Sequence, residues 1–101
     1  RGGLPLAVTL SNRMNVPLVP VIWQTRDGAV QEMRKILDLE RSEIATTLFV
    51  DDICDSGKTI NQIKKLAPHS RWVTLINKIP GAVEYSPLDV EDERWVVFPW
   101  E

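Results

Sequence analysis

The chain has 101 residues, of which 44% are hydrophobic and 26% charged, enough for one small domain with one core. Its net charge of -2 and pI near 5.4 provide no basic surface for a nucleic acid backbone, and no apolar segment is long enough to span a bilayer. A single cysteine, Cys54, excludes an internal disulfide and a two-cysteine metal or redox motif. These features favour a cytoplasmic protein that acts on small molecules and binds neither nucleic acid nor membrane.

The chain begins with the glycine-rich sequence Arg1-Gly2-Gly3. Because such a loop usually connects two elements, we expect a strand upstream of Arg1 that this chain does not contain. Residues 1–101 are then expected to form a single, N-terminally truncated domain. After the glycines, residues 4–14 have the period of an amphipathic helix, and Pro5 fits its first turn.

Residues 18–23 form a short apolar run rich in β-branched side chains, which predicts a buried strand, although Pro20 removes one hydrogen-bond donor. Residues 24–46 are charged and contain a turn signal at Arg26-Asp27-Gly28. The apolar residues of this segment are spaced like a helix face, but a mobile hairpin is an equally good interpretation.

The second half of the chain alternates apolar strands with helical patterns. Residues 47–51 predict a buried strand that ends in two carboxylates, residues 58–67 predict a helix, and two further strands are predicted over residues 72–76 and 95–98. This order predicts an α/β fold, an open and mainly parallel twisted sheet flanked by helices, of the Rossmann-like kind. Ligands bind at the carboxyl ends of the strands in such sheets, where Asp51 and Asp52 are expected.

The loop between the predicted strand and the predicted helix has the chemistry of a phosphate site. Unpaired backbone N–H groups at a helix start point towards one spot, and Gly57 lets the backbone approach a ligand closely. The hydroxyls of Ser56 and Thr59 can donate to phosphate oxygens. The neighbouring carboxylates need partners such as a ribose diol, a divalent metal or a protonated ring nitrogen, which are the parts of a nucleotide.

Two other interpretations of this loop have to be weighed. The triplet Gly57-Lys58-Thr59 also occurs in nucleoside-triphosphate loops, but these need another glycine five positions earlier, where this chain has Asp52. Asp51 and Asp52 could be solvated carboxylates at a strand end, but the Asp-Ser-Gly sequence that follows favours a binding site.

The sequence around this loop resembles the signature of type I phosphoribosyltransferases. In that signature, apolar or small residues precede two acids, two variable residues and then Asp-Ser/Thr-Gly-x-Thr, a pattern that residues 48–59 match. The order of the other predicted elements agrees with the family along nearly the whole chain. The resemblance implies transfer of a 5-phosphoribosyl group from 5-phosphoribosyl 1-diphosphate to a nucleobase, with release of pyrophosphate.

The resemblance also implies roles for the residues of the loop. Asp51 and Asp52 are expected near the ribose hydroxyls and to hold Mg²⁺. Asp55 is the expected catalytic residue, because it would approach the base. Five consecutive residues are expected to hold the 5-phosphate: Asp55, Ser56, Gly57, Lys58 and Thr59.

Two segments before the signature receive roles in the same way. Arg1 and Gly2 are expected to line the pyrophosphate loop, although Arg1 could simply be a charged terminus. Residues 24–27 are expected to belong to a lid, whose closure would protect the reacting centre from water.

The tail is similar to the nucleobase end of 6-oxopurine enzymes, notably the bacterial xanthine-guanine type. The similarity lies in Ile76-Asn77-Lys78 followed by Pro80-Gly81, and in residues 95–101. It implies that Lys78 donates to the purine O6, that Trp95 stacks on the ring, and that the backbone of Val96 or Val97 reads the 2-position. A surface role for Lys78 and a core role for Trp95 remain open at this point.

Several alternatives remain on the sequence alone. The chain carries Lys58 where the purine enzymes often have glycine, and a missing first strand would leave a sheet edge open for a partner chain or for nothing. The family implies a homo-oligomer, a dimer or tetramer. The function could instead be that of a phosphoribosyl-diphosphate-binding regulator, an inactive relative, or an orotate or other pyrimidine enzyme. Cys54 is expected to be an apolar filler and His69 a surface residue.

Overall fold

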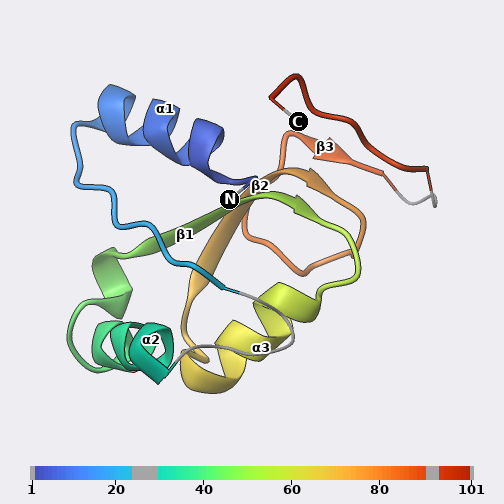
Figure 1. Cartoon of the computed structure of the whole chain (residues 1–101). Coiled ribbons are helices and arrows are strands. Elements are labelled where there is room, and N and C mark those ends of the chain that lie inside the picture. Colours follow the sequence, from blue (N-terminus) through green and yellow to red (C-terminus); the bar gives the residue numbers. More distant parts are fainter. Residues whose placement is uncertain (1, 24–29, 91–93, 101) are drawn as a thin grey trace.

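The computed structural model describes residues 2–23, 30–90 and 94–100. In this part of the chain, three parallel strands form one sheet in the order β1-β2-β3, and Figure 1 shows the helices arranged around it. The strands are β1 (Leu48–Cys54), β2 (Arg71–Asn77) and the short β3 (Leu88–Asp89). The predicted α/β class with an open parallel sheet is confirmed.

The helices lie on both sides of the sheet, with α1 on one side of β1 and α2 and α3 on the other (Figure 1). They are α1 (Leu4–Met14), α2 (Val30–Ser42) and α3 (Lys58–Leu66), and a short 3₁₀ turn, η1 (Ile44–Thr46), precedes β1. None of the helices described is both long and apolar enough to cross a membrane.

The first helix has the predicted bounds. Pro5 occupies its first turn, where the missing N–H costs no helical hydrogen bond. Asn15 ends the helix in the left-handed conformation at φ 53°, and its backbone N–H donates to the carbonyl of Ser11.

The core lies between the sheet and the helices α2 and α3. Phe49 of β1 and Trp72 of β2 are paired in register, and their rings stack with centroids 4.9 Å apart. Both side chains are buried, as is Ile36 of α2. Helix α3 contributes the face of Ile60 and Ile63, whose spacing of three residues was the basis for predicting this helix.

The strand predicted over residues 18–23 is wrong, because the structure contains no strand there. Two prolines, Pro17 and Pro20, remove backbone donors from this stretch. The segment is fixed by side chains instead: Val21 and Trp23 pack against the core, and the indole N–H of Trp23 donates to Oε1 of Gln62 at 3.0 Å. It is an irregular segment that is held on α3 and is not part of the sheet.

The strand predicted over residues 95–98 is also wrong, and the described tail has no regular structure there. The carbonyl of Arg94, just before this stretch, accepts a hydrogen bond from the side chain of Lys78, and Pro99, just after it, has no backbone N–H to donate.

Strands β1 and β2 run further than predicted, because they continue their parallel pairing as far as Cys54 and Asn77. The carboxylates of Asp51 and Asp52 therefore lie within β1 and not at its end.

The charged segment before β1 contains a helix and not a hairpin. Helix α2 continues through the polar residues 38–42, because Ile36 is fully buried and Leu39 packs against the same core. Helix α3 ends one residue earlier than predicted, with Ala67 as its cap. The turn signal at residues 26–28 and the proposed lid at residues 24–27 lie outside the described residues.

Candidate functional site

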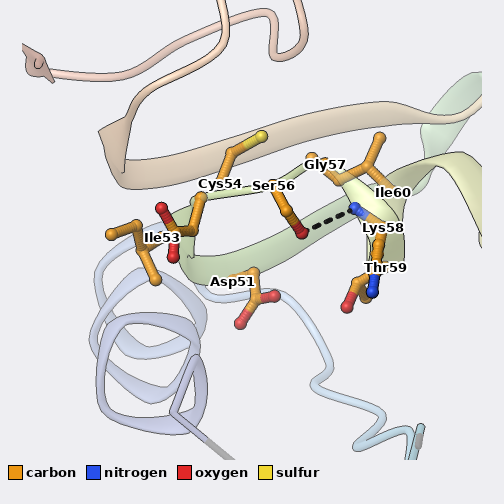
Figure 2. Close-up of a pocket in the computed structure, with 9 residues that line it drawn as sticks. Asp51, Ile53, Cys54, Ser56, Gly57, Lys58, Thr59 and Ile60 are labelled. Carbon is orange, nitrogen blue, oxygen red and sulfur yellow. Dashed lines mark hydrogen bonds between the residues drawn. The ribbon is translucent and has the colours of Figure 1, made fainter. Parts of the chain in front are cut away.

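A shallow pocket of about 100 Å³ lies between the end of β1 and the start of α3. It is lined by Asp51 and residues 53–60, so the loop that was predicted to bind phosphate forms its wall. Figure 2 shows these side chains around the loop, with the weak hydrogen bond from the Lys58 N–H to Ser56 Oγ at 3.4 Å drawn as a dashed line.

Gly57 makes the sharp entry into α3 possible. It occupies the N-cap position with φ 81° and ψ 2°, a left-handed conformation that costs little only for glycine. The N–H groups of the first helical turn, which have no partners within the helix, therefore come directly after the loop. Their partial positive charge makes the pocket suitable for an anion.

Asp51 and Asp52 form a pair of carboxylates beside this pocket. Oδ1 of Asp51 accepts the backbone N–H of Asp52 at 2.9 Å, and Oδ1 of Asp52 accepts the N–H of Ile53 at 2.8 Å. Burial raises the pKa of Asp51 to about 6, the hydrogen bond from the Asp52 backbone opposes this effect, and the negative charge of Asp52 adds to it. A cation bound beside the two carboxylates would therefore offset both the cost of burying the charge of Asp51 and its repulsion by Asp52.

The Gly2-Gly3 turn packs directly on this carboxylate pair. A Cβ added at Gly3 would lie 2.8 Å from Cα of Asp51 and 3.0 Å from the carbonyl oxygen of Val50, which is too close. At Gly2 an added Cβ would meet the carboxylate of Asp52. The structure thus brings Gly2 to Asp52 and Gly3 to Asp51, whereas Arg1 lies outside the described residues.

Lys78 directly follows β2 and reaches the loop that carries Asp55. Its Nζ is 3.3 Å from Oδ1 of Asp55, and it donates to the carbonyl of Arg94 at 2.6 Å. The side chain of Lys78 is only 9% exposed, whereas that of Asp55 is 56% exposed. The interpretation of Lys78 as a surface lysine is therefore wrong.

The two predicted base-binding residues of the tail are less closely associated with the pocket. Neither Trp95 nor Val96 lines it, and Trp95 is 82% exposed, so Trp95 is not a core residue. Their neighbour Arg94 is held by Lys78, which places the start of the tail near Asp55.

Two features of the site were missed from the sequence. The buried Asn77 fixes the turn after β2, because its side chain donates to the carbonyl of Ile79 and accepts that residue's N–H. The sequence signal for Asn77 was a polar residue that directly follows the predicted strand.

Cys54 is a buried core residue, as expected, but it also lines the pocket. The pKa of its thiol is raised, chiefly by burial and further by the negative charges of Asp51 and Asp55.

His69 is a surface residue, as predicted, with a side chain 80% exposed. Its Nδ1 lies 2.5 Å from Oε1 of Glu40, a contact between the end of α2 and the loop after α3 that the sequence did not indicate.

The sequence was compared with known protein families, curated proteins and solved structures. The model of the phosphoribosyl transferase domain matches residues 1–79. The chain belongs to this family. Relatives named xanthine-guanine phosphoribosyltransferase include those of Chromohalobacter salexigens, 29% identical over 107 residues, and Cereibacter sphaeroides, 28% identical over 113 residues. The protein of the same name from Nitratidesulfovibrio vulgaris is 26% identical over 109 residues.

The alignments with these relatives cover all of this chain but only 64%, 65% and 64% of the respective relatives, so the chain spans less than two thirds of their length. No solved structure matches it significantly. The family assignment agrees with the resemblance of the Asp51 to Thr59 loop to a phosphoribosyltransferase signature.

Proposed function

We propose that the chain belongs to a purine phosphoribosyltransferase and contains its binding loop for 5-phosphoribosyl 1-diphosphate. The reaction would transfer a 5-phosphoribosyl group from 5-phosphoribosyl 1-diphosphate to guanine, xanthine or hypoxanthine and release pyrophosphate, a step of purine salvage. The single observation that carries the proposal is the pocket of Asp51 and residues 53–60, in which helix N–H groups, hydroxyls and carboxylates adjoin. The names of the three relatives support the purine class.

The 5-phosphate fits the part of the pocket at the start of α3. Backbone N–H groups of the first helical turn and the hydroxyls of Ser56 and Thr59 can donate to its oxygens, and Lys58 adds a positive charge at the same helix end. The ribose hydroxyls would then be directed towards Asp51, which lines the same pocket.

The residues present fit a Mg²⁺ ion. Asp51 and Asp52 are adjacent oxygen donors, and the burial that disfavours the anionic form of Asp51 would be offset by a cation. Mg²⁺ is usually bound by one or two carboxylates together with substrate oxygens and water, so these two residues would hold it with the diphosphate. When bound, Mg²⁺ would neutralise negative charge on the diphosphate, which leaves as the bond between the diphosphate and the anomeric carbon breaks.

Asp55 is the proposed catalytic residue. It lines the pocket next to the phosphate loop, and its carboxylate is within ion-pair distance of Lys78, the residue expected at the base. As the bond between the anomeric carbon and the base nitrogen forms, Asp55 would accept or share the proton at purine N7. Its negative charge would also stabilise the positive charge that develops on the sugar.

The test is to measure pyrophosphate release by this chain with 5-phosphoribosyl 1-diphosphate, Mg²⁺ and, in turn, guanine, xanthine, hypoxanthine and orotate. We expect release with at least one of the three purines and none with orotate. The variant Asp55→Asn should lower turnover about 10²- to 10⁴-fold, while Asp38→Asn, an exposed acid of α2, serves as the matched control. Near-normal turnover of Asp55→Asn would exclude the catalytic role.

A second function is favoured by one observation, namely that Trp95 is 82% exposed and that neither Trp95 nor Val96 lines the pocket. A protein that binds 5-phosphoribosyl 1-diphosphate as a regulator, or an inactive relative, needs no assembled base site. Calorimetric binding of the diphosphate with no pyrophosphate release from any base would identify this function. Release with orotate alone would identify a pyrimidine enzyme.

A further inference from the structure

Lys78 contacts three parts of the molecule: the end of the neighbouring strand β1, the loop that carries Asp55, and the tail that begins at Arg94. We propose that Lys78 is a positioning residue that attaches the tail to the phosphate loop in the ligand-free protein. The attachment would place the tail and the catalytic carboxylate as one unit before a base binds. Only the consequence for base binding rests on the proposed function.

The backbone around Lys78 is fixed by hydrogen bonds on both sides. Its N–H donates to the carbonyl of Cys54 at 2.8 Å, which joins the end of β2 to the residue before the loop. The carbonyl of Asn77 accepts the N–H of Val90 at 2.9 Å. The side chain of Asn77 bonds to both backbone groups of Ile79, at 2.8 and 3.1 Å. Lys78 therefore projects from a rigid turn.

The side chain of Lys78 has a defined position as well. Removing an ammonium group from water costs free energy unless hydrogen-bond partners replace the water. The side chain of Lys78 is only 9% exposed, and it has two such partners. They are Oδ1 of Asp55 at 3.3 Å and the carbonyl of Arg94 at 2.6 Å. An ammonium group has three N–H donors, so one remains for a ligand.

The contact between Lys78 and the carbonyl of Arg94 helps to hold the start of the described tail. Further along, Phe98 is buried and its ring stacks on that of Trp100, with centroids 4.9 Å apart. Trp95, which lies between these two points, is 82% exposed and cannot hold the tail by burial. Loss of the Lys78 contact should therefore loosen the start of the tail while the Phe98 end stays in place.

This arrangement has a consequence for base binding. A base oxygen that takes the third Nζ donor of Lys78 would bind to a side chain already bonded to Asp55 and to the tail. Removing the ammonium group would then weaken base binding in two ways, through the lost donor and through a tail that is no longer in place. Binding of 5-phosphoribosyl 1-diphosphate, which depends on the loop and the start of α3, should change much less.

The test is backbone ¹⁵N NMR relaxation on the ligand-free chain, comparing the wild type with Lys78→Met, Lys78→Gln and Lys78→Arg. We expect the order parameters of residues 94–97 to fall in the Met and Gln variants, towards the values below about 0.6 that are typical of flexible backbone. The Arg variant keeps a charged donor and should restore most of the wild-type values. Lys65→Met, which removes an exposed lysine at the end of α3, is the control and should behave like the wild type.

The amide resonances of α3 report whether each variant is folded, and Lys78→Gln decides the comparison if Lys78→Met does not fold. Unchanged order parameters of residues 94–97 in the folded variants would overturn the attachment. In the pyrophosphate assay, Lys78→Met should raise the KM for the base about 10-fold or more and leave the KM for the diphosphate within about 2-fold. A wild type that releases no pyrophosphate would contradict the proposed function alone, because the relaxation result does not depend on activity.

Discussion

The raised pKa of Asp51 predicts that this carboxyl group makes the protein less stable as the pH rises. Its ordinary pKa of 3.8 increases to about 6 in the folded chain, chiefly because the group is buried. Between these two values the folded state binds more protons than the unfolded state, so the free energy of unfolding falls with increasing pH. The stabilising contribution is complete below about pH 3.8 and is lost as the pH passes about 6.

The difference between the two pKa values corresponds to at most about 3 kcal/mol, and because Asp51 keeps some contact with solvent we expect about 1–3 kcal/mol. The perturbation is Asp51→Asn, which keeps the shape of the side chain and an oxygen that can accept the N–H of Asp52. The free energy of unfolding is measured with urea for both proteins from about pH 4 to pH 7.5. The wild type should lose about 1–3 kcal/mol relative to Asp51→Asn over this range.

Two further variants separate the causes. Asp52→Asn removes the neighbouring charge but not the burial, so it should retain most of the pH dependence, since burial is the largest cause of the shift. Asp38→Asn, in an exposed part of α2, should not alter it. If the stability difference between wild type and Asp51→Asn stayed constant with pH, or grew as the pH rose, the argument from burial would be refuted.

Three other predictions concern the same region. Gly57→Ala should lower the free energy of unfolding by about 1–2 kcal/mol in urea titrations, because φ is 81° there although the nearest atom to an added Cβ is 3.5 Å away. Gly3→Ala should destabilise by about 1–3 kcal/mol in the same assay, since the added Cβ meets the backbone of β1, and it should cost more than Gly2→Ala, which meets only a movable carboxylate. Cys54 should react with a thiol reagent at least about 10-fold more slowly in the native chain than in urea, because burial and two nearby carboxylates raise the pKa of its thiol; equal rates would contradict this.

The sequence was most informative where a local pattern alone determines the structure. The spacing of Ile60 and Ile63 predicted α3, and Gly57 marked its entry because the turn requires a left-handed residue. The length of β1 could not be predicted from the same kind of signal. The two carboxylates of Asp51 and Asp52 suggested that the strand ends there. Ile53 and Cys54 nevertheless stay in the sheet, because they pair in register with Ile76 and Asn77 of β2.

The wrong strand over residues 18–23 has a physical explanation. Apolar and β-branched residues favour an extended backbone, but a strand also needs a neighbour with free backbone groups, which composition does not reveal. In the structure, the indole N–H of Trp23 donates to Gln62 and the ring packs on the core, so this segment is attached to a helix and not to a strand.

The contact between Asp55 and Lys78 was within reach of the sequence. Parallel pairing aligns Cys54 with Asn77, so the residues that follow them leave the sheet side by side. A predicted pair of neighbouring strands, each followed by a charge of opposite sign, would have suggested the ion pair. The attachment of the tail could not have been inferred, because it depends on a backbone carbonyl, that of Arg94.

The position of Asp51 and Asp52 in β1 also affects how copies of the chain can associate. β1 is the outer strand of the sheet among the described residues, and the Gly2-Gly3 turn lies against its backbone at Val50 and Asp51. Any part of this edge that the turn leaves uncovered offers backbone groups to which another chain can pair. Two copies that aligned their β1 strands would bring four carboxylates together, and their repulsion opposes such pairing at neutral pH. Acidification below about pH 6 protonates Asp51 and weakens this protection, so edge-to-edge aggregation should begin in mild acid.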